Sequence, residues 1–267
     1  KQGRQEKMKE RQAKLDELGA SSSGQGWDVA RNIVTMSSGV GVPFRWANLS
    51  AAQKTALGSE NVLKYLRGDK TNEGVAAGKF RERSHLLGDI VDSGVSVVAK
   101  PRARFVDSYN PGYSAFKAAN AGRAKMLYVG ANDGMLHAFD AATGIEKWAY
   151  IPSMLIKSGS DGLAALSYLD GGVPQFSHHF YVNQTPTVED VDFANTGGAG
   201  GNGDWHTILV AGLNKGGKGF YALDVTDPAA MGSEAGAAGK VLWEFTDSGS
   251  DDMGYSFGQP LVTKTRA

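Results

Sequence analysis

The chain of 267 residues has no cysteine, which excludes disulfide bonds, thiolate zinc sites and cysteine nucleophiles. It has no excess of charge either, because 28 basic residues balance 28 acidic residues. A balanced chain lacks the basic footprint of a nucleic-acid or membrane-surface protein, so neither partner is expected. No apolar run is long enough to cross a bilayer and no signal peptide is present, so membrane insertion is not expected. Because the sequence opens at Lys1, a signal further upstream is left open.

Glycine is abundant, with 36 residues, whereas proline is ordinary at 8. This combination is typical of a turn-dense β protein and argues against disorder. With 41% hydrophobic residues, a chain of this length can bury a sizeable core, enough for one large or two modest domains.

The clearest local pattern is a hairpin followed by a third strand. Residues 126–129 and 135–139 are apolar runs of strand-forming residues, and the hairpin-forming residues 131–134 separate them. A second turn at 140–144 leads into a third strand that carries Trp148. Both faces of these strands are apolar, so the unit needs a sheet packed on each side.

The same pattern returns in the second half of the chain. The three strands recur at residues 206–212, 219–224 and 240–243. Trp243 takes the position of Trp148, and this recurrence predicts packing between neighbouring sheets. The second copy carries an insertion at 227–239, whose Ala and Gly content predicts a mobile surface loop.

A further strand signal precedes each copy and appears again near the end, at residues 93–98, 185–188 and 259–262. Four strands per repeat form the blade of a β-propeller. The predicted fold is therefore mainly β: two propeller blades and the start of a third, an incomplete ring, preceded by a small strand-plus-helix subdomain. The expected domains are a charged helical segment with a Gly/Ser linker at 1–27, the small α/β subdomain at 28–88, and the blades at 89–267.

The predicted subdomain has recognisable element signals. Residues 33–36 form an apolar strand, and Ser50 with Gln53 forms a capping box before a short helix that Gly58 ends. A second helix at 60–67 is followed by Gly68, in the position of a left-handed C-cap. Further along, the aromatic side chains of the insertion at 105–122 are expected to cover a blade edge.

Arg67, Gly68 and Asp69 spell the tripeptide that integrins bind, and an exposed copy would present a guanidinium and a carboxylate to such a receptor. The structural interpretation is the stronger one. Arginine suits the negative end of a helix, glycine suits its cap, and aspartate suits the turn that follows.

Two acidic groups are candidates for calcium, which takes about six to eight oxygen ligands. The first comprises Asp190, Asp192, Asn195 and Asp204, which bracket the glycine-rich residues 196–203. The second comprises Asp247, Asp251 and Asp252. Both groups also fit ordinary turns. The adjacent His178 and His179 could ligate a metal together, but spacing supplies no third ligand.

At a larger scale, residues 128–148 resemble the repeat of pyrroloquinoline-quinone propellers, and more of the chain resembles the type IV pilus tip-associated adhesin (PilY) family. The segments that carry the second resemblance are VPFRWANLSAAQKTAL, VLKYLRGDKTNE, FRERSHLLGDIVDS, LVAGLNKGGKGFYALDVTDP and DMGYSFGQPLV.

This resemblance implies an exported bacterial protein of the pilus tip, cell surface or outer membrane that has no enzymatic activity. Such a protein primes pilus assembly, regulates extension against retraction and supports attachment and twitching. Its implied partners are minor pilins, the pilus tip complex and a host or abiotic surface, integrin included. The family's calcium loop lies in a later blade, so calcium is expected at a site outside this chain.

A quinone-dependent dehydrogenase and a periplasmic assembly scaffold are the alternative function classes. A quinone-dependent dehydrogenase would stack its cofactor over a tryptophan below a vicinal disulfide, which a cysteine-free chain cannot form, so no pyrroloquinoline quinone is expected. Asp140 and Asp224 recur as turn-formers and do not read as paired acid catalysts. The glycine-rich residues 212–219 link two strands and do not open a helix, so a phosphate loop is excluded. A periplasmic assembly scaffold would not need the segments within 42–92.

Overall fold

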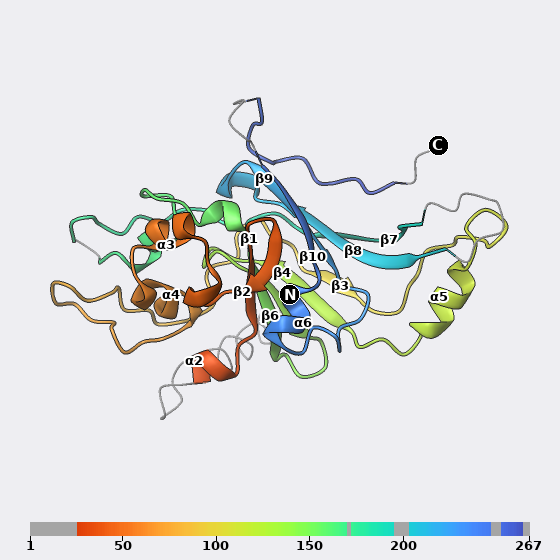
Figure 1. The fold of residues 1–267 in the computed structure, drawn as a ribbon, viewed down its shortest axis with the longest axis horizontal. Helices are drawn as coiled ribbons and strands as arrows, with labels where there is room; N and C mark the ends of the chain where they lie inside the picture. Colours follow the sequence, from red (N-terminus) through yellow and green to blue (C-terminus); the bar gives the residue numbers. More distant parts are fainter. Residues whose placement is uncertain (1–25, 170–171, 195–202, 247–251, 264–267) are drawn as a thin grey trace.

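The computed structural model describes residues 26–169, 172–194, 203–246 and 252–263. Two β-sheets lie side by side at its centre (Figure 1). The first has the strand order β2-β1-β6-β5-β4-β3 and the second the order β10-β9-β8-β7. The strands of the first sheet are β1 (Ile33–Ser37), β2 (Val40–Pro43), β3 (Ser96–Val98), β4 (Met126–Gly130), β5 (Leu136–Asp140) and β6 (Glu146–Ile151). Those of the second are β7 (Thr187–Asp192), β8 (Trp205–Gly212), β9 (Gly219–Asp224) and β10 (Val241–Thr246).

The predicted repeat is confirmed. Strands β3 to β6 are consecutive and antiparallel, and β7 to β10 repeat that arrangement. Glu244 on β10 joins the two units, because it accepts hydrogen bonds from Tyr150 and Ser153 of the first one. Trp148 is fully buried beside Tyr128, as sheet-to-sheet packing requires, whereas Trp243 is 42% exposed.

The N-terminal strand β1 is part of the first sheet. It pairs in parallel with β6, with Ile33 opposite Ala149, and antiparallel with β2. All five residues of β1 are buried, in agreement with the mainly apolar residues at 33–36. The predicted boundary near residue 88 therefore separates segments that share one sheet.

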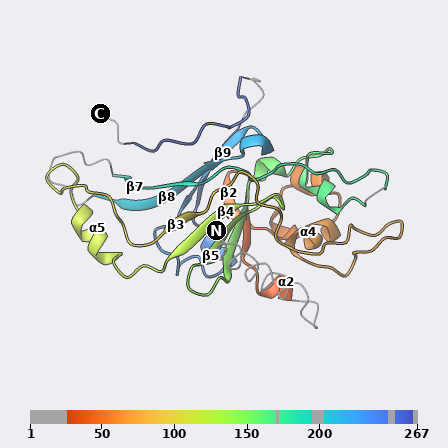
Figure 2. The same ribbon diagram turned by 180° about the vertical axis from the view of Figure 1, so that it is seen from behind.

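Short helices lie around the sheets, with α3 and α4 together at one end of the molecule (Figure 1, Figure 2). Ser50 and Gln53 form the predicted capping box of α3, and Gly68 caps α4 with φ 126°. Tyr65 of α4, Trp148 of β6 and Leu209 of β8 belong to one hydrophobic cluster, so α4 and both sheets share a core. The helices are α2 (Gly26–Val29), α3 (Ala51–Leu57), α4 (Glu60–Arg67), α5 (Tyr113–Ala119) and α6 (Glu234–Ala238). The 3-10 helices are η1 (Trp46–Asn48), η2 (Ser153–Leu155), η3 (Leu163–Ser167) and η4 (Asn214–Gly216).

Helix α5 lies at the opposite end of the molecule from α3 and α4 in both views (Figure 1, Figure 2). The ring of Tyr113 packs 4.8 Å from that of Trp205, and Phe116 packs 6.5 Å from it. These contacts cover the edge of the second sheet, as expected. Tyr109 is 73% exposed, so the expectation is wrong for this residue.

The insertion at 227–239 differs from the predicted mobile surface loop. Its Met231 and Ala237 are fully buried, and α6 packs on β2 so closely that a Cβ on Gly41 would lie 2.1 Å from the Ala238 carbonyl oxygen. The high Ala and Gly content reflects close packing of a helix on a strand, so the prediction of a mobile surface loop is wrong.

The C-terminal segment also differs from the prediction. Within the described residues 252–263 no strand forms at 259–262. The chain instead runs in an extended path along the second sheet, where Val262 packs against the cluster formed by Ile208, Val210 and Ala222 (Figure 1). The predicted helix at 1–18 lies outside the described residues.

Candidate functional site

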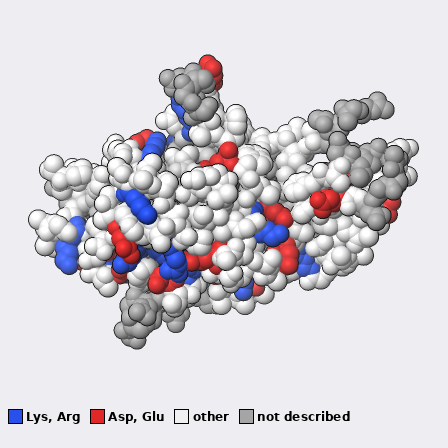
Figure 3. Space-filling model, viewed as in Figure 1, with Lys and Arg blue, Asp and Glu red and all other residues white. Residues whose placement is uncertain are grey.

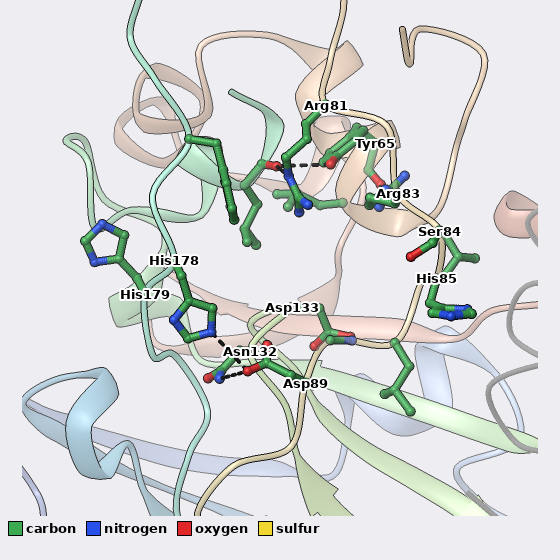
Figure 4. Close-up of a pocket in the computed structure, with 16 residues that line it drawn as sticks. Tyr65, Arg81, Arg83, Ser84, His85, Asp89, Asn132, Asp133, His178 and His179 are labelled. Atoms are coloured by element: carbon green, nitrogen blue, oxygen red, sulfur yellow. Dashed lines mark hydrogen bonds and ion pairs between the residues drawn. The ribbon is translucent and has the colours of Figure 1, made fainter. Parts of the chain in front are cut away.

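A cavity of ≈ 320 Å³ lies where the β4–β5 turn meets helix α4, η3 and two long connections. Figure 4 shows Arg81 and Tyr65 on one side of it and Asp89, Asn132 and Asp133 on the other, with His178 beside them. The lining also includes Arg83, Ser84, His85, Leu86, Leu87, Gly88, Leu166, Phe176 and His179. We call this space the sheet-end pocket. Polar and titratable side chains converge on this hollow.

Protein groups hold both arginines of the pocket. The Arg83 guanidinium donates to Glu73, to the Tyr65 carbonyl oxygen and to the Asp69 carbonyl oxygen, at 2.7, 2.8 and 3.1 Å. Arg81 donates to the Leu166 carbonyl oxygen at 3.3 Å, and its guanidinium lies 4.0 Å from the centre of the Phe176 ring. These contacts fix the positions of the guanidinium groups and satisfy much of their charge.

The opposite wall is acidic and polar. Asp89 Oδ2 lies 3.0 Å from His178 Nε2 and accepts a hydrogen bond from Asn132 at 3.1 Å. Partial burial alone would raise the pKa of Asp89, but hydrogen bonds from His178 and Asn132 bring it below its ordinary value. Asp89 is therefore an ionised acceptor at neutral pH. The adjacent His178 and His179 do not act as a pair, because His178 turns to Asp89.

Behind this wall lies a buried chain of charged groups. His137 Nε2 lies 3.0 Å from Asp133, and His137 Nδ1 lies 2.7 Å from Glu146. Glu146 also binds Arg31 through two contacts of 2.7 and 2.9 Å. Asp133 accepts hydrogen bonds from the backbone of Gly88 and Met135, which fixes the turn that lines the pocket.

Because both ring nitrogens of His137 face carboxylate oxygens, only the doubly protonated ring can donate to both. Burial would lower the pKa of His137, but the neighbouring Asp133 and Glu146 raise it to about 9. Burial would likewise raise the pKa of Glu146, and Arg31 and His137 bring it far below its ordinary value. The four groups Arg31, Glu146, His137 and Asp133 therefore form a neutral set of two cations and two anions.

The structure places residues 67–69 inside the fold. Arg67 is 1% exposed and Asp69 is 8% exposed. Arg67 donates to the carbonyl oxygens of Phe44 and Asp28, and Asp69 accepts from the Thr71 backbone, as a turn residue does. This burial contradicts the weaker alternative of an exposed receptor tripeptide, and the contacts of Arg67, Gly68 and Asp69 favour the helix-end interpretation.

The first acidic group is engaged in hydrogen bonds within the protein. Asp190 accepts from Tyr113 and Thr207, Asp192 accepts from the Asp204 backbone, and Asp204 contacts His206. Asn195 lies outside the described residues.

In the second group Asp247 and Asp251 lie outside the described residues, and Asp252 is exposed. Among the described residues no group of three or more His, Asp or Glu side chains could hold a metal ion. The described part of the chain thus does not fit a calcium site, and calcium binding elsewhere stays a prediction.

Sequence reasoning missed the sheet-end pocket. Its walls come from residues far apart in the chain, such as Tyr65, Asp89 and His178, and no local spacing connects them. The segment FRERSHLLGD resembles the family, but nothing in its pattern marks Ser84 or Asp89 as pocket residues.

On the face shown in Figure 3, acidic and basic side chains are interspersed, so charges of one sign do not form a continuous patch there. In the described ranges, no helix combines the length and the apolar character that crossing a membrane requires.

A family model described as the PilY1 beta-propeller domain matches residues 87–267, more than half of the chain. The chain belongs to the PilY1 family. The two four-stranded units are therefore blades of a β-propeller whose sheets do not close in this chain, and the resemblance and fold class expected from the sequence are confirmed.

Named relatives agree with this membership. Type IV pilus biogenesis factor PilY1 of Pseudomonas aeruginosa strain PAK is 38% identical over 237 residues, which cover 83% of this chain and 18% of the relative. A type IV pilus biogenesis factor PilY1 homolog of Xylella fastidiosa strain Temecula1 is 37% identical over 218 residues, which cover 79% of this chain and 16% of the relative. The chain thus spans less than a fifth of these PilY1 proteins.

A solved structure of a PilY1 protein is also similar in sequence. The C-terminal domain of Pseudomonas aeruginosa PilY1 is 37% identical, with a TM-score of 0.42 over 63% of this chain and 28% of that chain.

Proposed function

We propose that this chain is the opening part of the propeller of a type IV pilus biogenesis factor and that it acts in pilus assembly without enzymatic activity. The observation that carries the proposal is the match of residues 87–267 to the PilY1 propeller, together with relatives that are named as type IV pilus biogenesis factors. The protein is then exported and associated with pili at the bacterial surface.

We also propose a finer role, which membership of this family supports. The protein primes pilus assembly, opposes retraction, and supports attachment and twitching through contacts with minor pilins and the pilus tip. These contacts are assigned to exposed loops and blade faces, because binding surfaces of such scaffolds lie on loops positioned by rigid sheets.

The competing dehydrogenase function finds little support in the geometry. A stacked quinone needs an accessible tryptophan face. Trp148 is fully buried against Tyr128 and offers none, whereas Trp243 is 42% exposed. Asp140 accepts hydrogen bonds from the backbone of Ala142 and Thr143, which is the role of a turn residue. Asp224 is bound in the same way by the backbone of Thr226.

The test is genetic. In the bacterium that encodes this chain, we expect deletion of the gene to remove surface pili and twitching, and we expect the intact gene supplied in trans to restore both. Normal pilus number after deletion would contradict the assembly role. Disabling pilus retraction in the deletion strain separates the finer roles, because pili return if the protein only opposes retraction and stay absent if it primes assembly.

A second experiment tests the enzyme alternative. Purified protein supplied with pyrroloquinoline quinone and calcium is expected to show no dye-linked oxidation of alcohols. Steady turnover above that of the free cofactor would contradict the non-enzymatic proposal.

A further inference from the structure

We propose that the sheet-end pocket binds a neutral, hydroxyl-rich ligand, namely a single sugar ring. The proposal goes beyond pilus assembly and does not depend on it, because binding is measured with purified protein. Its basis is the combination of compensated charge, unused hydrogen-bonding capacity and an apolar wall in one cavity.

The charged residues that line the sheet-end pocket favour a neutral ligand. Arg83 is neutralised by Glu73, with a closest contact of 2.7 Å, and Asp133 faces the protonated His137 at 3.0 Å. Arg81 and Asp89 remain on opposite walls, so an anionic ligand would lie against Asp89 and a cationic ligand against Arg81 (Figure 4). A ligand without charged groups avoids both of these contacts between like charges.

The second step concerns hydrogen bonding. Both side-chain contacts of Asp89 use Oδ2, so Oδ1 keeps its capacity to accept hydrogen bonds. The Ser84 hydroxyl lines the cavity and has no hydrogen-bond partner in the described part of the chain. A carboxylate oxygen and a hydroxyl suit the hydroxyl groups of a sugar, which both donate and accept.

The third step concerns shape. Leu86, Leu166 and Phe176 are among the residues that line the cavity, and they supply apolar surface against which the C–H face of a sugar ring can pack. A volume of ≈ 320 Å³ lies at the lower end of the range for small-molecule pockets, about 300 to 1,000 Å³. The pocket therefore fits one ring, and a polysaccharide would enter only by a terminal residue.

The experiment is calorimetric titration of the whole 267-residue chain with glucose, galactose and mannose. Glucuronate, glucosamine and glycine serve as anionic, cationic and zwitterionic comparisons of similar polarity. We expect saturable binding of at least one neutral hexose. Glucuronate, glucosamine and glycine are expected to bind much more weakly or not at all. The absence of saturable binding for all three hexoses overturns the proposal, and so does a charged compound that binds as tightly as the best hexose.

Two variants test whether the ligand binds in the sheet-end pocket. Asp89→Asn is expected to weaken binding by about tenfold or more, and Ser84→Ala by several-fold, because one charged and one neutral hydrogen bond are removed. Asp252→Asn and Ser114→Ala make the same chemical changes at exposed positions and should leave the affinity unchanged.

Unchanged affinity in both pocket variants overturns the assignment of the site. Ser84 is exposed and makes no hydrogen bond in the described structure, so Ser84→Ala is expected to fold even if Asp89→Asn does not.

Discussion

Arg67 holds three parts of the chain together with one guanidinium group. Its Nη1 lies 2.9 Å from Glu234 Oε1 of helix α6, and the two side chains form an ion pair. The same side chain donates to the backbone of Phe44 after β2 and of Asp28 in α2. Burial lowers the pKa of Arg67 and Glu234 opposes that shift, so the charge is kept at neutral pH.

Truncation of this side chain is therefore expected to be costly. Arg67→Ala leaves Glu234 partly buried with Arg45 as its remaining partner, and we expect the free energy of unfolding to fall by about 3 kcal/mol, the low end for a broken buried pair. Urea denaturation measures the change. Arg104→Ala, at an exposed position, is the control. A loss below about 1 kcal/mol, typical of an exposed pair, would contradict the buried role of Arg67.

His137 makes stability depend on pH. Its folded pKa is about 9, above the ordinary value of 6.5, so its contribution is fully present below pH 6.5 and is lost as pH rises through 9. The groups that face it are Asp133 and Glu146, with Arg31 bound to Glu146 and Phe139 stacked on the ring.

The corresponding test compares His137→Gln with the unchanged chain. At about pH 6 the variant is expected to be less stable by roughly 3 kcal/mol, because a buried ion pair is broken. Above about pH 9 the difference should shrink, because the histidine has lost its charge. Urea unfolding across this range measures it, and a difference that stays constant with pH would contradict a protonated His137 in the fold.

A line of polar side chains connects one blade to the next. Ser93, just before β3, accepts a hydrogen bond from the Gly130 backbone at 2.9 Å and donates to the Gln184 carbonyl oxygen at 3.0 Å. Gln184, just before β7, accepts from the Gly212 backbone at 2.5 Å and donates to the Ser256 carbonyl oxygen at 2.7 Å. Gly130 and Gly212 end the equivalent strands β4 and β8, so the same joint occurs twice.

This joint predicts the effect of Gln184→Ala. The buried Gly212 amide would lose its acceptor, which costs about 1 to 3 kcal/mol. The segment around Ser256 would lose an anchor, and hydrogen exchange of its amides should become faster. Gln259→Ala is the matched control, because Gln259 is exposed and makes a single long contact of 3.3 Å with Thr187. Equal exchange in the two variants would contradict the anchoring role.

The packing of α6 on β2 can be tested at Gly41. A Cβ there would lie 2.1 Å from the Ala238 carbonyl oxygen, so Gly41→Ala forces the helix away from the strand. We expect a loss of about 1 to 3 kcal/mol, as for overpacked sites. Gly122→Ala is the control, because a Cβ at Gly122 meets nothing within 4 Å. Equal melting temperatures for the two variants would mean that α6 is not packed as described.

The sequence predicts the elements that local chemistry determines. Apolar runs of strand-forming residues, turn residues and the Ser50 capping box identify the strands of both blades and helix α3. It does not predict α6, the path of residues 252–263 or the sheet-end pocket, because each depends on contacts between distant segments. Gly41 against Ala238 and Asp89 against His178 are such contacts. The burial of Arg67 is of the same kind, since its partners Asp28 and Glu234 lie far from it in the chain.

The whole molecule is an open arrangement of two blades with a shared core. The second sheet carries a cluster of Ile208, Val210 and Ala222, and in the described part of the chain Val191, Leu242 and Val262 pack against it. Phe245 on the last strand is 62% exposed. In a propeller such a sheet packs against the next blade, so the fold is suited to a longer protein, in agreement with relatives that this chain covers only in part.

Whether this folded part of a PilY1-family protein acts in pilus assembly, as we propose, can be measured in cells. The most direct measurement is the number of surface pili in a deletion strain that expresses the whole gene with either Gly41→Ala or Gly122→Ala. We expect few or no pili with Gly41→Ala, which disrupts the packing of α6, and normal numbers with Gly122→Ala. Normal pili with both variants, when Gly41→Ala has been shown to destabilise the protein, would contradict the claim.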